Sequence, residues 1–432
     1  MNLGALSLEK APRFWTPVRF FITAPFFGVL AALIVFMDGG QLFQSRWSMA
    51  SLAVVHAFTL GYIAMVMLGA LFQMLPVVMG AALPQAGRAA AVAHLVMTAG
   101  ALCLVAAFLR QEPALFVAAI ALLVPVLVLF GAAVVVAIFR AGKTLTTGRS
   151  VQLAALGLVV TVVMGAWLAA GHAFAVPLDR SFTNDHAAWG FLGWILMLVI
   201  GISGQVIPMF LTTPQYPKYA GKGLVYLLVA LLGAGSLVPL RELQQLVVVL
   251  VSMLMLAWAT LTLYLLGKRR RKRFDITDRF WRTGMLCLVL GAGANLYGYF
   301  GGTVAGTDIS VMTGIFLLYG FAVSVINGML YKIVPFLVWL NLRMPVVMGK
   351  LEPGTKYYTP NIHEVIDVQP MKIQFAFHVA GLLLLVASTL VEGVVAYAAA
   401  TAVLVSSLLL LANLSHATRL YRKYAGQVIA VR

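Results

Sequence analysis

The sequence predicts an all-α protein that crosses a membrane many times, and three observations lead to this fold class. Hydrophobic residues make up 62% of the 432 residues and charged residues only 10%, with a mean hydropathy of +0.98. A soluble domain of this length would need far more polar surface. Apolar runs of about 20 residues recur along the chain, each long enough to cross roughly 30 Å of hydrocarbon. These runs are continuous rather than alternating, which favours helices over a β-barrel.

The apolar runs predict twelve membrane spans in a single membrane domain. Their expected ranges are 16–37, 51–76, 88–109, 113–139, 150–171, 186–211, 221–239, 243–266, 281–301, 310–340, 372–391 and 393–416. The longest polar connection is 341–371, which we expect to form a cytoplasmic loop.

The net charge of +17 does not indicate a nucleic-acid partner, because its distribution follows the spans. If the N-terminus is cytoplasmic, the segments on the other side hold only four of the 30 lysines and arginines, namely Arg46, Arg110, Arg180 and Arg241. This is the positive-inside pattern, and it predicts that both termini are cytoplasmic. The run KRRRKR at 268–273 either anchors this topology or binds anionic membrane lipid.

One short pattern occurs three times. The stretches GALFQMLP (69–76), GISGQVIP (201–208) and GMLYKIVP (328–335) all read G-x-x-x-[Q/K]-x-x-P. A further glycine precedes each by eight residues, at Gly61, Gly193 and Gly320. The copies fall every four spans, which predicts three four-helix repeats related by a pseudo-threefold axis, over approximately 16–139, 150–266 and 281–416.

Glycine, the polar residue and proline of this pattern stand at i, i+4 and i+7 and share one helix face. If that face points to the pseudo-axis, Gln73, Gln205 and Lys332 form a polar ring in the cytoplasmic half of the membrane. Lys332 then serves a proton- or ion-linked function. The alternative is that Lys332 packs structurally or extends its ammonium to the headgroups.

The seven histidines are candidate cofactor ligands. His56 opens the second span, His172 closes the fifth and His186 opens the sixth, so all three are expected near the outer face. Histidine is costly in a bilayer unless it is paired or metal-bound, and it is a common ligand of copper and haem iron. Each of the three is a candidate ligand, or an interfacial histidine satisfied by water.

The stretch HAFTLGYIAMVMLGALFQMLPVVMGAALP (56–84), the span count and the repeat together resemble the catalytic subunit of haem-copper oxidases. The resemblance implies that His56 binds haem and that His186 matches the copper-ligand histidine of helix six. The chain departs from that family because the spans 221–239 and 310–340 contain no histidine. An oxygen-reducing site therefore cannot be built as in the oxidases.

The chain more closely resembles the NnrS group, whose members are associated with haem, copper and tolerance of nitric oxide in bacteria. This resemblance implies a protein of the bacterial inner membrane that binds haem b, copper or both, and handles nitric oxide or metal and redox stress. A gas or other small molecule is the implied ligand, and His172 is added as a metal ligand on its expected depth alone. The alternative is a secondary transporter or proton-coupled permease that uses Gln73, Gln205 and Lys332. Neither reading assigns a catalytic residue.

Overall fold

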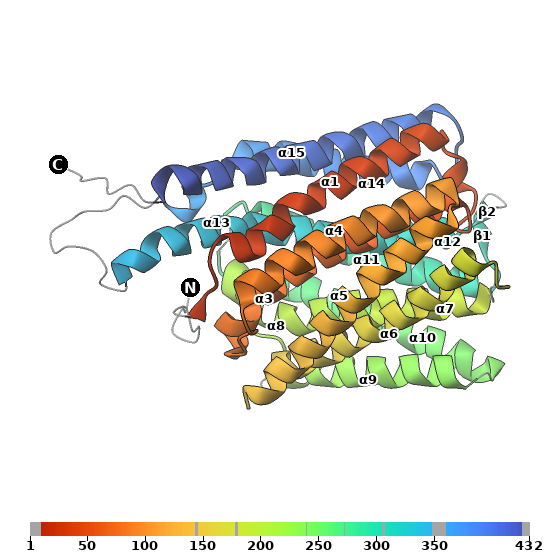
Figure 1. Cartoon of the computed structure of the whole chain (residues 1–432), viewed down its shortest axis with the longest axis horizontal. Helices are drawn as coiled ribbons and strands as arrows, with labels where there is room; N and C mark the ends of the chain where they lie inside the picture. Colours follow the sequence, from red (N-terminus) through yellow and green to blue (C-terminus); the bar gives the residue numbers. More distant parts are fainter. Residues whose placement is uncertain are drawn as a thin grey trace.

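A computed structural model describes residues 10–142, 146–177, 180–238, 240–271, 273–304, 307–347 and 360–425. Figure 1 shows a bundle of long helices that run roughly along one direction, with both chain termini at the same end. We call the end at which α1 begins and α15 ends the terminal end. The opposite end, which contains His56 and His186, is the histidine end. The only strands in the described ranges form a small antiparallel pair at the histidine end, β1 (Thr303–Val304) and β2 (Thr307–Asp308), with Thr303 opposite Asp308.

Long helices make up most of the described chain. The α-helices are α1 (Trp15–Asp38), α2 (Met49–His56), α3 (Met65–Met79), α4 (Ala86–Arg110), α5 (Pro113–Arg140), α6 (Thr146–Phe174), α7 (Arg180–Ala188), α8 (Met197–Leu211), α9 (Lys218–Leu237), α10 (Arg241–Gly267), α11 (Ile276–Tyr299), α12 (Ser310–Gly314), α13 (Ser324–Val347), α14 (Val368–Ala387) and α15 (Val394–Tyr424). Short 3-10 turns are η3 (Gln41–Phe43) and η7 (Ile362–Glu364). Of the predicted loop 341–371, residues up to Val347 continue α13, and residues 348–359 lie outside the described ranges.

The all-α membrane fold predicted from the sequence is confirmed. Within the described ranges, ten helices are long and apolar enough to cross a membrane. The other two predicted spans, 221–239 and 281–301, coincide with helices α9 and α11. α9 begins with Lys218, and α11 carries Asp278, Arg279 and Arg282 in its first two turns.

Three of the long continuous helices contain a π-helical segment between two α-helical parts. These segments are η4 (Ala57–Ala64) between α2 and α3, η5 (Trp189–Leu196) between α7 and α8, and η6 (Ile315–Val323) between α12 and α13. Each segment ends twelve residues before the proline of the G-x-x-x-[Q/K]-x-x-P pattern. A π turn contains one residue more than an α turn, so it changes which side chains face which neighbour.

The glycines of the repeated pattern are points of close helix approach. A Cβ on the first glycine of each pattern would lie under 3 Å from a side chain on the first helix of the same predicted repeat. The three contacts are Gly69 on Phe20, Gly201 on Ser150 and Gly328 on Phe280. Such contacts suit a membrane interior, where helices associate through close packing rather than through hydrophobic burial.

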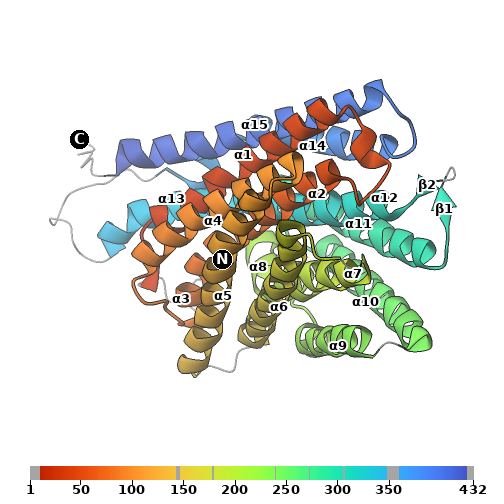
Figure 2. The same ribbon diagram turned by 45° about the vertical axis from the view of Figure 1, so that its right-hand side comes forward.

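The bundle closes on itself. The first helix, α1, packs extensively against the last, α15, and also against the rod formed by η4 and α3. The two views agree that α15, α1 and α4 follow one another across the bundle, while α9 lies at the opposite side (Figures 1 and 2). The stacking of Phe14 on Tyr421, with ring centroids 3.8 Å apart, joins the two ends of the chain.

Candidate functional site

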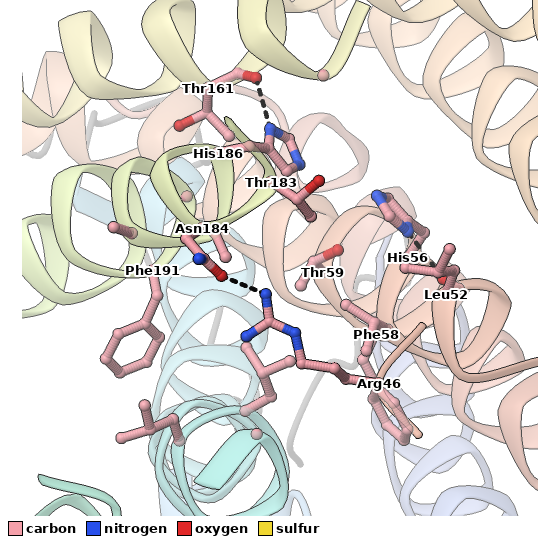
Figure 3. A pocket seen from close by; sticks show the side chains of 18 of the residues that line it. Arg46, Leu52, His56, Phe58, Thr59, Thr161, Thr183, Asn184, His186 and Phe191 are labelled. Atoms are coloured by element: carbon pink, nitrogen blue, oxygen red, sulfur yellow. Dashed lines mark hydrogen bonds between the residues drawn. The ribbon is translucent and has the colours of Figure 1, made fainter. Parts of the chain in front are cut away.

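A cavity of about 1420 Å³ lies at the histidine end. It is lined mainly by aliphatic and aromatic side chains, contributed by helices from all three predicted repeats. A few polar side chains reach it, and Figure 3 shows Arg46, Thr59, Asn184 and the two histidines His56 and His186. A large, mostly apolar cavity with few polar groups is the usual form of a cofactor or ligand site.

His56 is the last residue of α2 and directly precedes the π-helical segment η4. Its Nδ1 lies 2.8 Å from the carbonyl oxygen of Leu52, one helical turn earlier. A carbonyl can only accept, so Nδ1 carries the proton and Nε2 keeps its lone pair. This arrangement orients the ring and leaves a ligand nitrogen available, as in known metal-binding histidines.

His186 is held in the same way by a different helix. It lies in α7, three residues before η5 begins, and its Nδ1 is 3.1 Å from the carbonyl oxygen of Thr161 on α6. Its ring packs over Gly165, where a Cβ would come within 2.9 Å of the ring Cε1. Glycine at this position therefore provides the space that the imidazole occupies.

The two imidazoles face one another across the cavity. Their ring centroids are 6.3 Å apart with an interplanar angle of 17°, and Figure 3 shows the free ring nitrogens pointing toward each other. A metal-bound imidazole nitrogen lies roughly 2.0–2.1 Å from its metal and roughly 1.1 Å from its ring centroid, which places two opposed ligands roughly 6.3 Å apart. The observed spacing therefore fits one metal atom between His56 and His186.

His172 lines the same cavity but does not join this pair. Its ring stacks on Phe116 with centroids 5.1 Å apart, and Phe108 contacts both His172 and His56. Across the described ranges, no group of three His, Cys, Asp or Glu side chains could hold a metal ion. The structure thus brings together two of the three predicted histidines.

The half-buried His94 and the buried His378 both have hydroxyl partners. His94 Nε2 is 2.8 Å from Thr23 Oγ1, and His378 Nε2 is 2.7 Å from Ser324 Oγ. Both rings also pack edge-on or tilted against a phenylalanine, Phe20 or Phe280. These contacts account for two histidines as packing and hydrogen-bonding residues of the membrane core.

The residues of the predicted polar ring have separate environments. Lys332 Nζ donates to Asp275 Oδ2 at 2.7 Å, and both side chains are about one-fifth exposed. Gln73 is buried, and its Oε1 has no hydrogen-bond partner among the described residues, while Gln205 is half-buried. Asp275 also caps α11 by accepting from Thr277 N.

Sequence reasoning did not single out Asp275, Thr161, Gly165 or Arg46. An N-cap signal was available for Asp275, because an aspartate directly precedes an apolar helix there. The other three act through contacts between segments distant in sequence, which no local pattern reveals.

The sequence matches no model of a known protein family, and comparison with characterised proteins finds no significant relative. The residues and their geometry alone therefore support the function proposed below.

Proposed function

We propose that this chain is a haem-binding membrane protein in which His56 and His186 would hold a haem b. The observation that carries the proposal is the facing pair of imidazoles, 6.3 Å apart, each oriented through Nδ1 by a backbone carbonyl. Two histidines would be enough protein ligands to hold a haem, because haem iron is commonly held by histidine.

The donor set favours haem over a bare divalent ion. Structural zinc typically takes about four protein ligands, and the described part of the chain offers no third ligand beside the pair. The cavity of about 1420 Å³ and its apolar lining suit a flat, largely apolar macrocycle. Arg46 donates to Asn184 in this cavity and is a suitable partner for haem carboxylates. Copper(I), a soft ion that two nitrogen ligands can hold in line, is the second candidate.

The chain's own residues would bind the haem and orient the two imidazole rings that hold it. Leu52 and Thr161 fix the two ring tautomers, Gly165 leaves room for His186, and the apolar lining keeps water from the metal. A haem with two histidine ligands supplies reversible one-electron transfer when bound. We place this chemistry in the handling of nitric oxide or of metal and redox stress. The sequence has no histidine in the predicted spans 221–239 and 310–340, which argues against oxygen reduction.

We also propose the finer architecture expected from the sequence, with twelve spans as three four-helix repeats. Its support is the equal placement of the three π-helical segments and of the three glycine contacts. We place the protein in a bacterial inner membrane on its resemblance to the NnrS group. The charge distribution supports both termini in the cytoplasm, so that the cavity faces the outer side. The transporter alternative depends on a ring of Gln73, Gln205 and Lys332, and in the structure Lys332 pairs with Asp275.

The deciding experiment is a visible spectrum of the detergent-purified protein, with haem and copper quantified. We expect a Soret band and about one haem per chain, and loss of both in His56→Ala and in His186→Ala. His416→Ala is the matched control, because His416 is an exposed histidine on α15. Protein that binds neither haem nor copper, even after reconstitution with haemin, would refute the proposal.

A further inference from the structure

A second pocket, of about 320 Å³, lies at the terminal end where α10 ends and α11 begins. It is lined by Leu266, Gly267, Arg269, Asp278, Arg279 and Arg282. Three guanidinium groups thus surround one carboxylate. The pocket is unconnected with the histidine pair.

Asp278 balances only part of this charge. Arg282 Nε donates to Asp278 Oδ2 at 3.0 Å, and Arg269 Nη1 lies 3.8 Å from the same oxygen. The third guanidinium, of Arg279, lies over the ring of Phe274, 5.9 Å from its centroid. The neighbouring acid Asp275 is engaged by Lys332, so the pocket keeps an excess of positive charge.

The other oxygen of Asp278 needs a donor. Asp278 is 4% exposed, and its Oδ1 has no hydrogen-bond partner among the described residues. A buried carboxylate oxygen in this state calls for a hydrogen-bond donor that the described residues do not supply. A ligand that fits must therefore offer both an anionic group for the arginines and a donor, such as a hydroxyl, for Asp278.

The pocket walls are held in place by the fold. Arg270 N donates to Thr212 O at 2.9 Å, and Arg271 N donates to Thr212 Oγ1 at 3.3 Å, which ties the α10–α11 turn to the end of α8. The N-terminus of α11, capped by Asp275, adds its own preference for negative charge. The site is thus organised before any ligand arrives.

The surface next to the pocket is apolar. Leu286 and Leu290 follow Arg282 at i+4 and i+8 on α11 and are 55% and 52% exposed. Residues at this spacing lie on one helix face, one turn apart. An anionic group at the arginines would therefore continue directly into an apolar strip along the membrane-spanning helix, which suits acyl chains and not a free phosphate.

We propose that this pocket binds the headgroup of an anionic, hydroxyl-bearing glycerophospholipid of the phosphatidylglycerol type. The phosphate accepts hydrogen bonds from Arg269, Arg279 and Arg282, and a headgroup hydroxyl donates to Asp278 Oδ1. The acyl chains lie against Leu286 and Leu290. Basic pockets between membrane helices on the positively charged side are known to take such headgroups.

Native mass spectrometry of the delipidated full chain tests the site, with phosphatidylglycerol, phosphatidic acid and phosphatidylcholine as probes. Phosphatidylglycerol should bind most tightly. The Arg269→Gln/Arg282→Gln variant should bind it roughly fivefold more weakly for each arginine removed, since a basic residue near an anionic lipid contributes about 1 kcal/mol. Arg343→Gln is the matched control, because that arginine packs over Trp339 elsewhere on the protein and should bind lipid like the wild type.

Three outcomes would overturn the proposal. Equal binding of phosphatidylglycerol and phosphatidylcholine would show that the pocket does not select anionic headgroups. Equal binding of phosphatidylglycerol and phosphatidic acid would show that the headgroup hydroxyl does not contribute. Displacement of the lipid by inorganic phosphate alone would make this a phosphate site. None of these results depends on whether the protein carries haem.

Discussion

Two pairs of polar side chains, one toward each end of the bundle, are satisfied in different ways. At the histidine end, His56 and His186 are each bonded through one ring nitrogen and present the other to a cavity. In the terminal half, Lys332 and Asp275 satisfy one another at 2.7 Å. A polar group is costly in an apolar interior unless it is paired. The ion pair is thus satisfied within the chain, whereas each histidine directs its second ring nitrogen into the cavity.

The largest expected effect comes from removing one residue of a π-helical segment. Deleting Leu60 should convert η4 to an α-helix and rotate His56 by roughly 100° relative to the pattern glycines. The Soret band should then disappear although the protein still inserts. The same deletion in η6, at Leu317, is the control, because that rod carries no histidine. Equal loss from both deletions would show a folding defect and not a loss of alignment.

Gly165→Ala tests the space beneath His186. The new Cβ would come within 2.9 Å of the imidazole, so the ring must move away from the line that joins it to His56. We expect haem affinity to fall at least tenfold and stability to drop by about 1–3 kcal/mol, the usual cost of overpacking. Gly204→Ala is the control, since nothing lies within 4 Å of that site. An unchanged haem titration would contradict the assigned role of His186.

Removing the Lys332–Asp275 ion pair should lower the stability of the protein and leave the haem spectrum unchanged. Lys332→Met leaves the Asp275 carboxylate without its partner and should cost about 1 kcal/mol, because the pair is partly solvated. Asp275→Asn in the same chain should recover part of this loss, and thermal melts of the four proteins give the coupling energy. A shifted Soret band in Lys332→Met would mean that the two ends are coupled.

The smallest effect is expected at His172. Its ring stacks on Phe116 and is separated from His56 by Phe108. His172→Ala should therefore cost about 0.5–1.5 kcal/mol of ring packing. Haem content should stay at the wild-type value in a pyridine haemochrome assay. Loss of haem comparable with that of His56→Ala would make His172 a ligand in another state of the protein.

Local sequence patterns were sufficient for much of the fold. Continuous apolar runs predicted the helices because a span must be about 20 residues long and bond its own backbone. The spacing of Gly69, Gly201 and Gly328 from their prolines predicts three related helices, and in the structure each glycine contacts the first helix of its predicted repeat. The candidate histidines were identifiable because histidine is rare and costly in such runs.

Only the tertiary structure decided which polar residues meet. His56 and His186 are 130 positions apart in the sequence, and their alignment depends on two π-helical segments and on Gly165 of a third helix. The partner of Lys332 is Asp275, 57 positions away, and not the glutamines of the repeated pattern. Sequence periodicity reports which face of one helix is apolar, but contact between helices depends on their packing and register. Short-range patterns therefore determined the elements, and packing determined the site.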